Sequence, residues 1–199
     1  MPISEKLLSL NLISGQKLMR LFDKLYQDIL EVDITSGSGF ISDMWDRYES
    51  GEKSLNGKVF EGLLACLFYR LEILPLFVQA KLAFVPNVDF DFVAYSKEIG
   101  PVVLSAKTSL RERYKQADLE GMMLRQVHRK SKCYLLTLEE TEAAIVSSKI
   151  DRGEVLGLDA VVVVTAPSFD ELLVELKNYS FYEPDPVDVI CSSKIIKGS

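Results

Sequence analysis

The stretch VLSAKTSLRERYKQADLE, residues 103–120, combines a short apolar run, a lysine and a long polar segment. The apolar run ends on Lys107, and the polar residues that follow have the composition of a helix. A strand followed by a helix is therefore expected here. A charged residue at the end of an apolar strand is unusual unless the charge has a role, so Lys107 is the first candidate functional residue.

The composition describes an ordinary globular protein. The chain has 199 residues, of which 48% are hydrophobic and 26% charged, and this length favours one domain with a well-buried core. We expect a single domain over residues 1–199, with a helical extension at 1–50 and a core at 56–138. Residues 139–199 are expected to complete the domain with an αβα unit and a tail.

The elements on either side of this stretch are predicted from hydrophobic periodicity and turn residues. Before it, we expect helices at 15–32 and 56–71, a loop at 34–39, and strands at 77–85 and 89–95. From 102 onward, we expect strands at 102–107, 133–138 and 160–165, helices at 109–130, 139–150 and 168–178, and a mostly irregular tail from 182. This order predicts an α/β fold in which a mixed central sheet is flanked by helices, with an N-terminal helical extension.

The cellular setting is predicted from what the sequence lacks. The longest apolar runs, such as 63–69, are far shorter than a membrane span. The first residues do not have the basic and then apolar pattern of a signal peptide. The three cysteines show no metal-ligand spacing and are expected to be reduced and buried. These features predict a cytoplasmic protein without a membrane partner.

The charge distribution is uneven. The net charge of −6 is unfavourable for nucleic-acid binding. Between residues 107 and 132, however, basic side chains dominate: Lys107, Arg111, Arg113, Lys115, Arg125, Arg129, Lys130 and Lys132. Because the position of charge matters more than its total, this window predicts a local positive surface.

The predicted hairpin between 89–95 and 102–107 brings polar groups together. With a turn near residues 98 and 99, Asp91 lies roughly opposite Ser105 and Lys107. Ser105 and Lys107 are two residues apart and so share one face of their strand. Asp89 has the same parity as Asp91 and is the alternative carboxylate, because the register is inferred.

This set of side chains is suited to phosphodiester hydrolysis. Mg²⁺ is held in proteins by one or two carboxylates, and a nearby lysine can stabilise the charge that develops on phosphate. A second acid is expected beside Asp91, and Glu120 and Glu61 are the candidates. The simpler alternative is that Asp89, Asp91 and Lys107 are solvated residues of an edge strand.

These residues resemble the PD-(D/E)xK nuclease superfamily, whose core is a helix, a three-stranded meander, a helix and a strand. More narrowly, they resemble type II restriction endonucleases of the EcoRII-like branch, which cut CCGG, CCNGG or CCWGG sites. The resemblance covers about residues 56–138. It implies that Ser105-Ala106-Lys107 occupies the catalytic dyad and that Glu120 supplies the displaced acid. It also implies that Glu61 is the upstream helical glutamate and that Asp91 is the metal ligand.

The same branch has an arginine–acid–arginine reader after the lysine, and Arg111-Glu112-Arg113 is similar to it. Arginine can bond guanine O6 and N7, and a carboxylate can accept from the cytosine amino group. The resemblance therefore implies a G·C-containing site, whereas the alternative is a salt-bridged, solvated turn. Lys115 would contact phosphate or solvate the helix. Two departures concern the acid: the interval from Asp91 to Lys107 is short, and neither candidate aspartate directly follows a proline, because Pro86 stands three residues before Asp89.

The sequence thus predicts a Mg²⁺-dependent, sequence-specific endonuclease of double-stranded DNA from a bacterial restriction system. A homodimer would place one site on each strand of a palindrome. Two alternatives remain open. One is the small cleaving subunit of a heterodimeric enzyme, in which a larger partner reads the sequence. The other is a DNA-binding module with a decayed nuclease fold.

Overall fold

The structure, a computed structural model, describes residues 1–48, 54–83, 85, 87–184 and 190–198. Its centre is a six-stranded sheet of order β5-β4-β3-β2-β1-β6. The strands are β1 (Leu76–Leu82), β2 (Phe90–Ser96), β3 (Gly100–Lys107), β4 (Lys132–Thr137), β5 (Ala160–Val163) and β6 (Ile190–Ile196). The β3–β4 and β4–β5 pairs are parallel and the other pairs are antiparallel, so the sheet is mixed.

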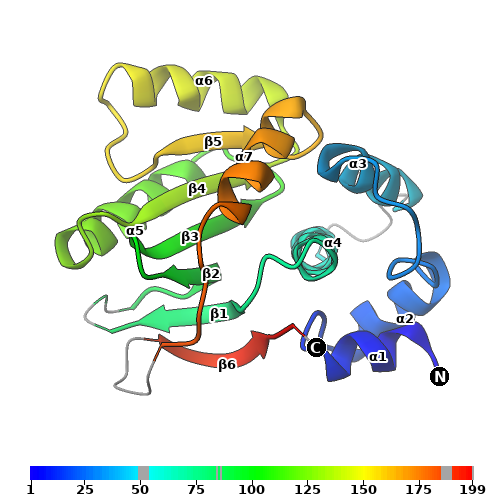
Figure 1. Ribbon diagram of the computed structural model, residues 1–199. Coiled ribbons are helices and arrows are strands. Elements are labelled where there is room, and N and C mark those ends of the chain that lie inside the picture. Colours follow the sequence, from blue (N-terminus) through cyan, green and yellow to red (C-terminus); the bar gives the residue numbers. More distant parts are fainter. Residues whose placement is uncertain (49–53, 84, 86, 185–189, 199) are drawn as a thin grey trace.

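The helices form a layer on each side of the sheet (Figure 1). They are α1 (Ile3–Ser9), α2 (Gln16–Leu25), α3 (Gly37–Arg47), α4 (Asn56–Arg70), α5 (Arg113–Val127), α6 (Glu140–Asp151) and α7 (Pro167–Lys177). Apolar residues of α1–α4 and α7 pack in one core cluster with one side of the sheet, and those of α5 and α6 pack in a second cluster. The predicted α/β class, with a mixed sheet flanked by helices, is confirmed.

Helix α4 is the central helix of the larger core. Nine of its residues are buried, so it is apolar on most of its circumference. The Phe68 ring packs edge-on against Phe92 of β2 at 5.6 Å. Each such buried aromatic residue removes a large apolar area from water, which stabilises the contact between helix and sheet. Helix α4 is therefore held firmly over the strand that carries Asp91.

Most predicted elements are present, and the differences are local. The helix predicted at 15–32 ends at Leu25, and the loop predicted at 34–39 already contains the start of α3. The Ser36 side chain caps α3 by accepting from the Gly39 amide at 3.0 Å. The helix predicted at 109–130 is shorter, because α5 begins at Arg113 and ends at Val127. Cys66 and Cys133 are free and buried, as expected, whereas the side chain of Cys191 lies outside the part that the structure describes.

The prediction of an irregular tail from residue 182 is wrong for residues 190–196. Residues 190–196 form β6, which pairs with β1 from Leu76↔Ile196 to Leu82↔Ile190. The strand is stabilised by a partner more than a hundred residues earlier in the sequence, and local composition carries no signal of such pairing. Helix α1, which was not placed by the sequence, lies within the predicted helical extension. In the described part of the chain, no helix is long and apolar enough to cross a membrane.

Candidate active site

Asp91 and Lys107 are joined across two neighbouring strands. The pair Phe92↔Leu104 sets the hairpin register and places Asp91 opposite Ser105, as the sequence predicted. Oδ2 of Asp91 accepts from Lys107 Nζ at 2.6 Å and from the Ala106 amide at 2.8 Å. Only 10% of the Asp91 side chain and 19% of the Lys107 side chain are exposed. A partly desolvated pair of this kind is stronger and better fixed than a surface ion pair.

Glu61 approaches the same carboxylate from helix α4. Its Oε2 accepts from Nε2 of Gln79 at 3.2 Å. Burial, followed by the negative charge of Asp91, raises the pKa of Glu61 to about 7, against the opposing effects of Lys107 and Lys58. Because charges act on one another at short range in a partly buried site, Glu61 and Asp91 belong to one cluster.

Strand β1 is distorted where it faces this cluster. Its pairing with β2 includes Val78↔Phe92 and Ala80↔Phe90 on either side of Gln79. Gln79 itself has φ of 50°, which is uncommon for a residue with a side chain and costs about 1–3 kcal/mol. Strained backbone of this kind is concentrated at functional sites.

The Asp91–Glu61 cluster opens into a cavity of about 540 Å³. Asn11, Leu12, Ile13, Ser14, Leu18, Lys58, Glu61, Gly62, Ala65, Val78, Gln79, Asp91, Phe92 and Lys194 line it. Its walls thus come from the α1–α2 region, α4, β1, β2 and β6. Ligand sites typically have volumes of about 300–1,000 Å³ and a few convergent polar groups, which this cavity also has.

The two remaining acids occupy different positions. Burial raises the pKa of Glu120, and the charges of Lys107, Asp91 and Asp89 also act on it. Glu120 accepts from Gln116 Nε2 at 2.7 Å, so it lies near the cluster but is bound within its own helix. The Asp89 side chain is 56% exposed and pairs with Lys81 at 3.6 Å. The structure therefore brings Asp91, rather than Asp89, into the cavity.

The donor chemistry at Asp91 and Glu61 fits a hard divalent cation. In the residues that the structure describes, no group of three or more His, Cys, Asp or Glu side chains is close enough to hold a metal ion. Mg²⁺ does not need such a group, because it retains several waters and commonly uses one or two carboxylates. A cation between Asp91 and Glu61 would offset their mutual repulsion, which contributes to the raised pKa of Glu61.

Ser105 and the predicted reading residues differ in their exposure to solvent. Ser105 is buried and pairs with Leu135 of β4. Arg111, Glu112 and Arg113 are exposed at the start of α5. Glu112 forms an ion pair with Lys115, which is also exposed.

The turn before α5 is fixed by α6. Oε2 of Glu142 accepts from the buried Leu110 amide at 2.6 Å. Immediately after it, Arg111 has φ of 27°, a strained backbone conformation. The connection between Lys107 and α5 is therefore short and held in place, which fixes the exposed arginines relative to Lys107.

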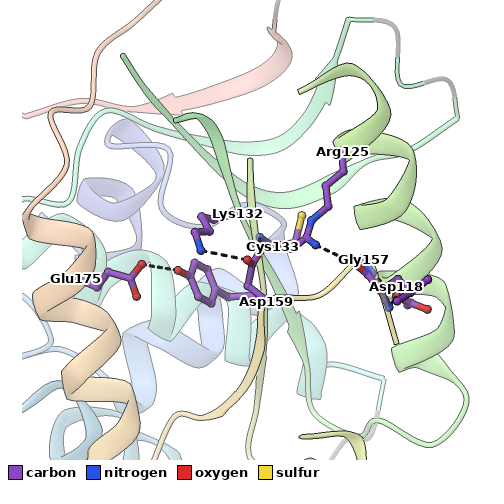
Figure 2. A network of polar contacts seen from close by, with 9 residues as sticks. Asp118, Arg125, Lys132, Cys133, Gly157, Asp159 and Glu175 are labelled. Atoms are coloured by element: carbon purple, nitrogen blue, oxygen red, sulfur yellow. Dashed lines mark hydrogen bonds and ion pairs between the residues drawn. The ribbon is translucent and has the colours of Figure 1, made fainter. Parts of the chain in front are cut away.

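Helix α5 is also held by the loop before β5 (Figure 2). The Asp118 carboxylate accepts from the Leu156 and Gly157 amides at 2.9 and 2.5 Å. Further along the helix, Arg125 pairs with Asp159 at 2.6 Å, and Asp159 also accepts from the Cys133 amide. A Cβ atom at Gly157 would overlap the Asp118 carbonyl oxygen, so only glycine permits this approach. The loop thereby fixes the helix that carries Glu120.

The sequence did not indicate several residues that line the cavity. Lys58 precedes Glu61 by one helical turn, so the i,i+3 spacing could have indicated it. Gln79, Asn11 and Lys194 carry no comparable signal. They reach the cavity through the distortion of β1, the α1–α2 connection and the long-range pairing of β6.

Comparison with solved structures gives a distant likeness. The chain is similar to a solved complex of the restriction endonuclease PspGI with its substrate DNA, at 17% sequence identity and a TM-score of 0.46. The similar region covers 74% of this chain and 58% of that chain, so it spans less than two-thirds of PspGI. No family model and no curated protein matches the sequence.

Proposed function

We propose that this chain is a Mg²⁺-dependent endonuclease that hydrolyses phosphodiester bonds of double-stranded DNA. The observation that carries the proposal is the position of Asp91. Its carboxylate bonds Lys107 at 2.6 Å and lines the same cavity as Glu61. A carboxylate pair with an adjoining ammonium is the chemistry that a metal-assisted phosphodiesterase requires.

The residues have separate roles in this proposal. Asp91 and Glu61 would hold Mg²⁺, with Glu120 as a further acid and Asp89 as the weaker alternative to Asp91. When bound, Mg²⁺ lowers the pKa of a coordinated water and offsets charge on phosphate. Lys107 stabilises the negative charge that develops on the scissile phosphate, and Ser105 fills the position of the second acid in the dyad.

We further propose that Arg111, Glu112 and Arg113 read the DNA sequence. All three side chains are exposed beside the segment that leads from Lys107. Two arginines would bond guanines and Glu112 would accept from cytosine, while Lys115 would contact phosphate. The hydrogen bond from the Leu110 amide to the Glu142 carboxylate would fix the reading residues relative to Lys107.

Site-specific cleavage by such an enzyme corresponds to a type II restriction endonuclease of the PD-(D/E)xK superfamily, similar to the EcoRII-like branch, in the bacterial cytoplasm. A homodimer would cut both strands of a palindrome. The second candidate is the small cleaving subunit that works with a larger recognition subunit. The net charge of −6 favours this second candidate, because it limits the phosphate contacts that one chain can make.

Digestion of plasmid DNA with Mg²⁺, and again with EDTA, tests the proposal. Discrete, EDTA-sensitive double-strand cuts are expected from a homodimer, and run-off sequencing of the fragments would give the recognition site. Nicking that needs an added partner would indicate the cleaving subunit. DNA binding without any cleavage would support a module with a decayed nuclease fold and contradict the proposed activity.

A further inference from the structure

We propose that Lys58 and Lys194 bind a phosphate group of the DNA strand beside the phosphate that is cleaved. The inference rests on the proposed function and deepens it, because it assigns the cavity's basic side chains to the substrate backbone. Both lysines line the same cavity as Asp91 and Glu61. Neither belongs to the sequence motifs that predicted the nuclease.

Lys58 is placed by helix α4. It lies three residues before Glu61, and residues with this spacing share one face of a helix. Both side chains line the same cavity, so Lys58 can act on an anion that binds beside that carboxylate.

Lys194 is placed by the long-range pairing of β6. It lies opposite Val78 of β1, and Val78 lies opposite Phe92 of β2. These residues form a row across the sheet, and every member of the row lines the cavity. Burial lowers the pKa of Lys194, so its ammonium is partly desolvated and would interact more strongly with an anion than an exposed lysine would.

The N-terminal segment fixes this side of the cavity. Nδ2 of Asn11 donates to the Ile195 carbonyl at 3.0 Å, next to Lys194. Asn11 and the following residues 12–14 also line the cavity. The α1–α2 connection and β6 are therefore bound to each other where both contribute to the cavity wall.

The charges of the lining explain why the ligand would be an anion. Among the described lining residues, the ionisable groups are Asp91, Glu61, Lys58 and Lys194. A divalent cation would balance both carboxylates, and the lining would then carry a net positive charge. A cavity of about 540 Å³ has room for a phosphate with its adjoining sugar. In a DNA-cleaving enzyme, that anion is the backbone of the substrate.

The test is the salt dependence of DNA binding, measured by fluorescence anisotropy with Ca²⁺ replacing Mg²⁺ so that binding is observed without cleavage. The labelled duplex is one that the wild-type protein cleaves with Mg²⁺. The double variant Lys58→Met/Lys194→Met should reduce the slope of log affinity against log salt by about 0.9, because one phosphate is no longer neutralised, and should weaken binding about tenfold. Lys194→Arg should keep the wild-type slope, because it keeps the charge.

Lys197→Met is the matched control. Lys197 lies on the chain just beyond β6, pairs with Glu183 at 2.7 Å and does not line this cavity. Its slope should equal that of the wild type. If the Lys58→Met/Lys194→Met double variant also keeps the wild-type slope while the wild type cleaves DNA, the lysine assignment is overturned and the endonuclease proposal stands. If the wild type cleaves no DNA at all, both proposals fail together.

Discussion

Oδ2 of Asp91 bonds both Nζ of Lys107 and the backbone amide that precedes this lysine. The carboxylate is therefore held in one orientation. Glu61 lies in the same cavity and is electrostatically coupled to it. If Asp91 and Glu61 form a cation site, then Asp91 in β2 and Asp89 just before β2 should behave differently when each is replaced.

The first prediction concerns cation binding. Saturating Ca²⁺ should raise the melting temperature of the wild type, because a ligand at a hundred times its Kd stabilises by about 2.7 kcal/mol. Asp91→Asn and Glu61→Gln should each abolish most of this rise. Asp89→Asn is the control: Asp89 is exposed and pairs with Lys81, so its rise should match that of the wild type. If only Asp89→Asn lost the rise in melting temperature, Asp89 rather than Asp91 would be the cation ligand, which would contradict the proposed site.

The second prediction concerns pH. The pKa of Glu61 is raised to about 7 in the folded protein, chiefly by burial, and is near its ordinary value when the chain is unfolded. The folded state therefore keeps the Glu61 proton up to a higher pH than the unfolded chain does. The stabilisation that this proton binding gives is lost as pH rises through about 7. In EDTA, the free energy of unfolding should decrease between about pH 5 and pH 8, by about 1–3 kcal/mol from this residue.

Urea unfolding at several pH values measures this effect. Glu61→Gln should flatten the decrease, whereas Glu171→Gln, at an exposed position of α7, should not change it. Ca²⁺ should oppose the decrease in the wild type, because the cation favours the ionised carboxylate. Parallel pH curves for the wild type and Glu61→Gln would contradict the assigned position of this carboxyl group.

The third prediction concerns sequence reading. Arg113 is exposed at the first position of α5, and its loss should leave the metal site intact. Arg113→Ala should reduce discrimination between the cognate site and single-base-pair variants by about 1–3 kcal/mol. Competitive cleavage of the two duplexes measures this ratio. Selectivity equal to that of the wild type would show that Arg113 does not read bases.

The fourth prediction concerns the contact that holds α5. Gly157→Ala would place a methyl group against the Asp118 backbone and should destabilise the fold by about 1–3 kcal/mol. Gly57→Ala is the control: among the described residues, no atom beyond its chain neighbours and its own helix backbone lies within 4 Å of the added group, and alanine favours the helix. Thermal unfolding of both variants measures the difference. A Gly157→Ala variant as stable as Gly57→Ala would contradict the close approach of Gly157 to the Asp118 carbonyl oxygen.

Local sequence patterns predicted the parts of the site that depend on local geometry. The hairpin is short, and its turn fixes the register, so the proximity of Asp91 to Lys107 followed from counting residues. Helical periodicity placed Glu61 on α4, and the apolar run of β3 placed Lys107 at its end. The choice between Asp89 and Asp91 needed the structure, because parity alone treats them alike.

The rest of the site depends on contacts between distant parts of the chain. Lys194 lies in a segment predicted to be irregular, and it reaches the cavity only because β6 pairs with β1. Asn11 reaches it because its side chain bonds the backbone of that same strand. Gln79 is turned toward Glu61 by a strained backbone conformation that hydrophobic patterning cannot indicate. Long-range pairing and strain leave little trace in a single sequence.

The most direct test of the endonuclease assignment is the single-turnover rate of Mg²⁺-dependent DNA cleavage by the wild type and by Lys107→Met. The methionine retains the length of the side chain but removes the ammonium that contacts Asp91 at 2.6 Å. The wild type should cleave at discrete sites, and Lys107→Met should be slower by about 100- to 1,000-fold while still binding DNA. Equal cleavage rates for the two proteins, or no cleavage by the folded wild type on any DNA, would contradict the assignment.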